Sequence, residues 1–105
     1  MTDYKLSDLI ISMVVATENV DILKRYHDMP ETIKTMYQEI LDTCVNSNSK
    51  CSFSFGSRGH LNIIINDDDI DSLMLINQLI NLKHDKLHVQ IEYVTDKESC
   101  IEFRY

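Results

Sequence analysis

An acidic run in the second half of the chain carries the residue types best suited to metal chemistry. Asp67, Asp69 and Asp71 match the first three ligand positions of a calcium-binding loop. The remaining positions do not fit, because Ser72 stands where the loop needs glycine and Gln78 stands where it needs glutamate. A strand pattern, and not a helix, precedes the run. We therefore interpret these aspartates as the acidic first turn of a helix, where carboxylates cap free amides and favour the helix dipole.

Two histidines, His84 and His88, are four residues apart and would suit zinc if they shared one helix face. A helix is expected to end within residues 83–86, so the two side chains need not point the same way. Zinc would also require further ligands, and Cys100 comes near His88 only if the strands align to bring it there. We interpret both histidines as surface residues, one in a loop and one on the polar face of a strand.

The three cysteines give no sign of a catalytic nucleophile. Cys44 falls on the apolar side of a helix pattern and Cys51 on the apolar side of a strand pattern, so both are expected in the core. Cys100 falls on a polar strand face beside Glu98 and Glu102, which would raise the pKa of its thiol.

A short glycine-containing loop at residues 56–59 follows a strand pattern, as a phosphate-binding loop does. A second strand pattern comes after it, whereas a phosphate-binding loop opens into a helix. We therefore predict a hairpin turn at this point. No serine stands with histidine and aspartate in a recognisable catalytic arrangement, and no cofactor is expected.

Apart from Cys44, the residues discussed above lie in a predicted hairpin, helix and second hairpin over residues 50–105. Alternating apolar and polar residues predict the four strands. In the first hairpin we expect Phe55 opposite Leu61, and in the second we expect Tyr93 opposite Ile101. Each hairpin then has one apolar face and one mostly polar face, as in an antiparallel sheet that is covered on one side.

The helix predicted between the hairpins, over residues 67–83, is apolar around most of its circumference. A helix of that kind should be covered on more than one side, by the sheet and by the N-terminal helices. The aromatic residues of the strands fall on the face that is needed for the core. Because the opposite face carries acids, we do not expect a sheet that stacks on RNA bases.

The first half of the chain predicts helices. A stripe of apolar residues favours one long or bent helix over residues 5–28, with residues 17–19 as the weak point where two short helices would meet instead. Pro30 ends this helix and starts a second one over residues 30–45. The stripe consists of Leu6, Leu9, Met13, Ala16, Val20, Leu23 and His27.

The sequence therefore predicts a single α+β domain over residues 1–105 with the order ααββαββ. Helices cover one face of a four-stranded antiparallel sheet, and the polar face remains for solvent or a partner. Neither the strand order nor direct pairing of the two hairpins follows from these patterns.

Charge and composition narrow the partners. The chain has 105 residues with 17 acidic and 10 basic side chains, for a formal net charge of −7. This charge argues against nucleic acids and anionic membranes and suits a basic protein. No stretch approaches the roughly 20 apolar residues of a membrane span, and we expect no secretion signal. Three cysteines leave at least one unpaired, so a reducing cytoplasm is the expected compartment.

Without a catalytic constellation, we interpret the chain as a non-enzymatic protein-binding domain. Small acidic α+β domains include toxin immunity proteins, phage inhibitors of host enzymes and secretion chaperones, and by that analogy an inhibitor or immunity-type protein in a phage–bacterium conflict is the leading hypothesis. The expected contact residues are Gln90, Glu92, Glu102 and Arg104 on the sheet, with Asp68, Asp69 and Asp71 at its rim.

Two alternatives stay open. The first is a self-associating structural or accessory protein, such as a homodimer that uses the helical stripe of residues 6–27 or the sheet edges. The second is a small metal-dependent regulator that uses the aspartates of residues 67–71 or the histidine pair.

Overall fold

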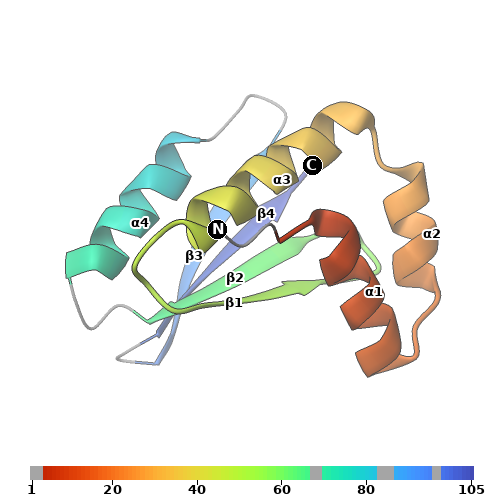
Figure 1. Cartoon of the computed structure of the whole chain (residues 1–105), viewed down its shortest axis with the longest axis horizontal. Helices are drawn as coiled ribbons and strands as arrows, with labels where there is room; N and C mark the ends of the chain where they lie inside the picture. Colours follow the sequence, from red (N-terminus) through yellow and green to blue (C-terminus); the bar gives the residue numbers. More distant parts are fainter. Residues whose placement is uncertain (1–3, 67–69, 83–86, 96–97) are drawn as a thin grey trace.

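The computed structural model of the chain describes residues 4–66, 70–82, 87–95 and 98–105. Within these ranges the chain is α+β, with helices on one face of an antiparallel sheet, as the sequence predicted (Figure 1). The helices are α1 (Leu6–Thr17), α2 (Asp21–Asp28), α3 (Glu31–Val45) and α4 (Ile70–Asn81). The strands are β1 (Cys51–Phe55), β2 (Leu61–Asn66), β3 (His88–Thr95) and β4 (Glu98–Arg104).

The N-terminal stripe does not form one long helix, so the favoured prediction for residues 5–28 is wrong and the break at residues 17–19 is real. Glu18 adopts a left-handed conformation with φ 56°, which ends α1. Asn19 then accepts a hydrogen bond from the amide of Asp21 at 3.0 Å, which satisfies a free donor at the start of α2. The break divides the stripe, so that Leu6 and Leu9 are buried whereas Val20 is 70% exposed.

The start of α1 is held by α3 and not by a side chain of its own first turn. The amide of Leu6 donates to Oε1 of Gln38 at 2.8 Å, and Nε2 of Gln38 donates to the carbonyl oxygen of Tyr4 at 2.8 Å. One side chain thus satisfies backbone groups at a helix end that would otherwise lack partners. It also fixes α1 beside α3.

The sheet has the strand order β1-β2-β4-β3, so the two hairpins pair directly through β2 and β4. The predicted register of the first hairpin is confirmed, with Phe55 opposite Leu61. The predicted register of the second hairpin is wrong by two residues, because Ile101 pairs with Ile91 and Tyr93 pairs with Ser99. The physical reason is a connection shorter than expected, since Thr95 already pairs with Glu98. A shift of two residues leaves the side chains of residues 88–92 on their predicted faces, and the pairing becomes irregular between Tyr93 and Thr95.

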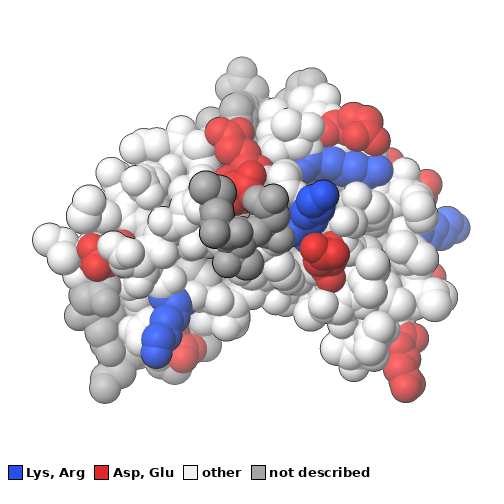
Figure 2. Space-filling model, viewed as in Figure 1, with Lys and Arg blue, Asp and Glu red and all other residues white. Residues whose placement is uncertain are grey.

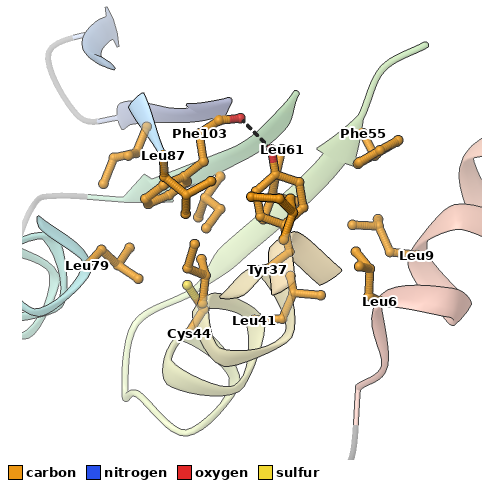
Figure 3. Packing of buried hydrophobic residues seen from close by; sticks show 14 of the residues in the cluster. Leu6, Leu9, Tyr37, Leu41, Cys44, Phe55, Leu61, Leu79, Leu87 and Phe103 are labelled. Carbon is orange, nitrogen blue, oxygen red and sulfur yellow. Dashed lines mark hydrogen bonds between the residues drawn. The ribbon is translucent and has the colours of Figure 1, made fainter. Parts of the chain in front are cut away.

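The helix layer follows the strand order. The first helix packs against β1 and α3, and α3 packs against α4, so α1 lies at the β1 end and α4 at the other end (Figure 1). Tyr37 of α3 reaches the sheet from the centre of this layer, where its hydroxyl lies 3.1 Å from the carbonyl oxygen of Phe103. Figure 3 shows this tyrosine among the buried residues that α1, α3, α4 and the strands contribute to one core.

The fourth helix departs from expectation. Leu75 and Leu79 are buried against the core, as Figure 3 shows for Leu79. The opposite side is open, however, with Ile70, Leu73 and Met74 exposed by 72%, 58% and 56%. The predicted cover is present on the side of α3, one of the N-terminal helices, which packs against α4, whereas the described residues leave the outer side of α4 uncovered. The other N-terminal helices pack elsewhere, with α1 against α2, β1 and α3 at the β1 end of the sheet (Figure 1).

Candidate functional site

The face of the sheet opposite the helices is the surface on which most of the predicted contact residues meet. Strand pairing aligns its side chains in rows across all four strands. One row consists of Ser54, Asn62, Glu102 and Gln90; the next consists of Ser52, Ile64, Cys100 and Glu92; Asn66 and Glu98 form a third, shorter row. We call these ten residues the open sheet face.

The open sheet face has an uncharged middle with three acids around it, and the same strand faces continue to the pair His88 and Arg104 at one end. Ile64 is 36% exposed and pairs with the half-buried Cys100. The carboxylates of Glu92 and Glu98 are exposed, and that of Glu102 is half-buried. Specific protein interfaces often combine a less polar centre with a polar rim, and this face has that arrangement on a small scale.

Two of the carboxylates are already oriented by neighbours. Nε2 of Gln90 donates a hydrogen bond to Oε1 of Glu92 at 2.7 Å. Nδ1 of His60 lies 3.7 Å from Oε1 of Glu102, within reach of an ion pair when the imidazole is protonated. Such contacts reduce the rotamer freedom that the acids would lose when they bind a partner.

Cys100 lies between acids, as the sequence suggested. Burial, followed by the charges of Glu92 and Glu102, raises the pKa of its thiol above the ordinary value. The direction agrees with the prediction, and the across-strand neighbour Glu92 acts on the thiol together with the predicted Glu102. A thiol of raised pKa is a weaker nucleophile at neutral pH, so Cys100 contributes chiefly a small, weakly polar surface.

Comparisons with protein-family models, with curated proteins and with solved structures find no match. The function is therefore argued from the geometry of this chain alone.

The structure brings together four of the seven predicted contact residues. Gln90 and Glu102 are direct partners, Glu92 stands in the adjacent row, and Arg104 pairs with His88 near the end of the same strands. Asp71 is not part of this group, because it lies in the first turn of α4, within the layer that covers the other face. Asp68 and Asp69 lie outside the described residues.

The metal hypotheses gain no ligand set from the described part of the chain, which contains no group of three His, Cys, Asp or Glu side chains arranged to hold an ion. The calcium-loop prediction falls on Asp67 and Asp69, and the histidine pair includes His84. These three residues lie outside the described ranges. His88 is exposed.

Sequence reasoning missed a contact between two cysteines. Cys44, at the end of α3, and Cys51, at the start of β1, share a side-chain hydrogen bond. This bond lowers the pKa of the Cys51 thiol, and together with burial it raises the pKa of Cys44. Both residues were placed separately on apolar faces, and a spacing of seven residues across a polar loop gave no signal that the thiols meet.

A groove of about 560 Å³ lies between the C-terminal end of α3 and α4. Uncharged polar side chains such as Asn46 and Gln78 line it, Met74 and Leu75 contribute apolar surface, and Asp71 is the acid that lines it.

No helix among the described residues is long and apolar enough to cross a membrane.

Proposed function

We propose that this chain is a non-enzymatic protein-binding module, of the inhibitor or immunity type, that docks its open sheet face on a basic surface of a partner protein. The observation that carries the proposal is the face itself. It spans four strands, lies opposite the described helices and places three carboxylates around an uncharged middle.

The charge of the whole chain supports a basic partner. A net charge of −7 steers a positively charged surface toward the chain and disfavours acidic competitors. The carboxylates of Glu92 and Glu102 then give direction at close range, because both are held by neighbours before the partner arrives. A guanidinium group fits this role well, because it can bind a carboxylate through two parallel hydrogen bonds.

The test begins with affinity capture from a lysate of the source organism at low salt and at 0.5 M salt, followed by mass spectrometry. A single basic protein that is retained at low salt and lost at high salt becomes the candidate partner. Association is then measured by surface plasmon resonance with the double variant Glu92→Lys/Glu102→Lys. We expect association to slow about tenfold or more, because the change reverses the steering field at the contact.

The matched control makes the same change of charge elsewhere. Asp28→Lys/Glu39→Lys alters two exposed acids in the helix layer, away from the open sheet face. We expect the control to slow association much less. If both double variants slow association equally, the net charge acts without this face, and if neither does, the proposal is wrong.

A further inference from the structure

The hydrophobic core is left open at the β3 end of the molecule. On the apolar face of the sheet, Ile101 of β4 is fully buried, whereas its pair Ile91 on β3 is 37% exposed. On the helix above, Leu79 faces the core and is buried, whereas Ile80 on the next face is 37% exposed. At the opposite end the core is closed by α1, which packs on β1.

The open flank of α4 points away from α3. The groove residues Asp71, Gln78 and Leu82 lie on the side of α4 that faces the end of α3. Because successive residues of a helix are rotated by about 100°, the position of any other residue around α4 follows from its number. Leu73 and Ile80 lie on the other side of the helix. They therefore face outward beyond the last strand of the sheet.

That last strand forms one edge of the sheet that the described residues build. Among the described strands β3 pairs with β4 alone, so one row of its backbone amides and carbonyls has no strand partner. It is eight residues long and contains neither proline nor lysine, the residues that commonly protect an edge strand from pairing. The other edge strand, β1, has five residues, and Phe53 within it is stacked against Tyr4 at 5.5 Å.

We propose that the β3 end binds a second copy of this chain, with β3 pairing antiparallel to the partner's β3 and α4 packing beside the partner's α4. An edge strand is completed by another strand, and the adjacent apolar flank requires an apolar partner. A second copy supplies both at the correct relative height. The two-fold axis of such a pair is perpendicular to the sheet, so both helix layers fall on the same side.

The charge distribution favours a copy at this place. The chain carries −7 overall and repels itself over most of its surface, but the charged side chains that β3 and α4 contribute within the described residues are Glu92 and Asp71. Figure 2 shows mostly uncharged atoms over α4. Pairing centred on Ile91 places Gln90 opposite Glu92 of the other copy, and these two residue types already form a hydrogen bond within the chain.

The contact would be small for a specific interface. An eight-residue strand is about 26 Å long, and a sheet with one helix layer is about 20 Å thick, which gives roughly 500 Å² for each copy. The total of roughly 1,000 Å² lies at the lower limit for a specific interface. We therefore expect a reversible dimer with a dissociation constant in the micromolar range.

Sedimentation velocity between about 1 and 200 μM tests the proposal on the full chain. We expect a monomer–dimer equilibrium that persists at 0.5 M salt, because the contact is apolar and hydrogen-bonded. In the variant Leu73→Lys/Ile91→Lys we expect dissociation to become at least tenfold easier. Lysine is chosen because it lowers the net negative charge, so a loss of the dimer cannot come from increased repulsion.

The control is Val15→Lys, which alters an apolar residue that is 73% exposed on α1, at the other end of the helix layer. We expect this variant to dimerise as the wild type does, and circular dichroism verifies the fold of each protein. A wild-type monomer at 200 μM overturns the proposal. So does a dimer that survives Leu73→Lys/Ile91→Lys or is lost in Val15→Lys. Since the proposal does not depend on the open sheet face, none of these outcomes bears on the proposed function.

Discussion

Removing the hydroxyl oxygen of Tyr37 should lower the free energy of unfolding by an amount that can be worked out from its hydrogen bonds. The side chain is fully buried, and its hydroxyl lies 2.8 Å from the carbonyl oxygen of Gly59 and 3.1 Å from that of Phe103. The ring packs edge-on against Phe55 at 6.3 Å and Tyr105 at 6.4 Å. Tyr37→Phe keeps these ring contacts and removes the hydrogen bond that joins α3 to the sheet.

The expected loss follows from the number of protons available. A hydroxyl donates one proton, so Tyr37 satisfies one of the two carbonyls at a time, and its net contribution is about 1 kcal/mol. The variant also leaves a buried carbonyl with one partner fewer, which adds to the loss. We expect the free energy of unfolding to fall by about 1–2 kcal/mol. For a domain of this size that corresponds to a melting temperature lower by roughly 5–15 °C.

The effect should also depend on pH in a direction that the structure fixes. Burial, together with the nearby Tyr105 and Glu102, raises the pKa of Tyr37 above its ordinary value of 10.0. A raised pKa in the folded state means that the stabilising contribution is complete below pH 10 and is lost as the pH rises above it. Phenylalanine has no such dependence. The stability difference between wild type and Tyr37→Phe should therefore shrink above pH 10.

Urea denaturation followed by circular dichroism measures both effects, at pH 7 and in steps from pH 9 to 11. The control is Tyr26→Phe, a half-buried tyrosine whose ring lies 4.5 Å from Nζ of Lys34. Its loss should be within about 0.5 kcal/mol at pH 7. If Tyr37→Phe matches the wild type at pH 7, the hydrogen bond contributes no stability. If the difference widens above pH 10, the assignment of the raised pKa is incorrect.

Two further outcomes test other parts of the structure. Gly59 has φ +84°, and an added Cβ would meet a ring atom of Tyr105 at 2.9 Å, whereas a Cβ on Gly56 would meet nothing within 4 Å. In urea denaturation we therefore expect Gly59→Ala to lower the free energy of unfolding by about 1–3 kcal/mol and Gly56→Ala to lower it by less than about 1 kcal/mol. Equal losses in the two variants would contradict this difference. Iodoacetamide should modify Cys51 before Cys44 in the native protein, because the hydrogen bond between the two thiols lowers the pKa of Cys51 and raises that of Cys44. Peptide mass spectrometry that finds Cys44 labelled first would refute this assignment.

Local turn chemistry explains which registers could be predicted. The first hairpin has Gly56 and Gly59 between its strands, and these glycines indicated the length of the turn in the sequence. In the structure Gly59 adopts a positive φ. The second hairpin has neither glycine nor proline near its turn, and several loop lengths agree with the same alternation. Similarly, the left-handed conformation of Glu18 is uncommon for its residue type. The apolar spacing of residues 6–27 therefore predicted a continuous helix across Glu18, where the structure has a break between α1 and α2.

The open sheet face was predictable, whereas the open end of the core was not. Alternation assigns Glu92 and Glu102 to one face under any even shift of register. The apolar residues of α4 indicate burial, but they do not say which neighbour covers each side. That depends on the strand order and on the position of α1, which the sequence left open.

The two proposed surfaces share β3, and their geometry makes them additive. Side chains of Gln90 and Glu92 point to the open sheet face, while the free backbone edge of the same strand points sideways to a second copy. Dimerisation would therefore join two acidic faces into one continuous sheet without covering either. A partner with two basic patches would bind such a dimer more tightly than a monomer, through effective concentration and not through new contacts. In that case Leu73→Lys/Ile91→Lys weakens partner binding while leaving every carboxylate of the face in place, whereas a partner with a single patch binds this variant as it binds the wild type.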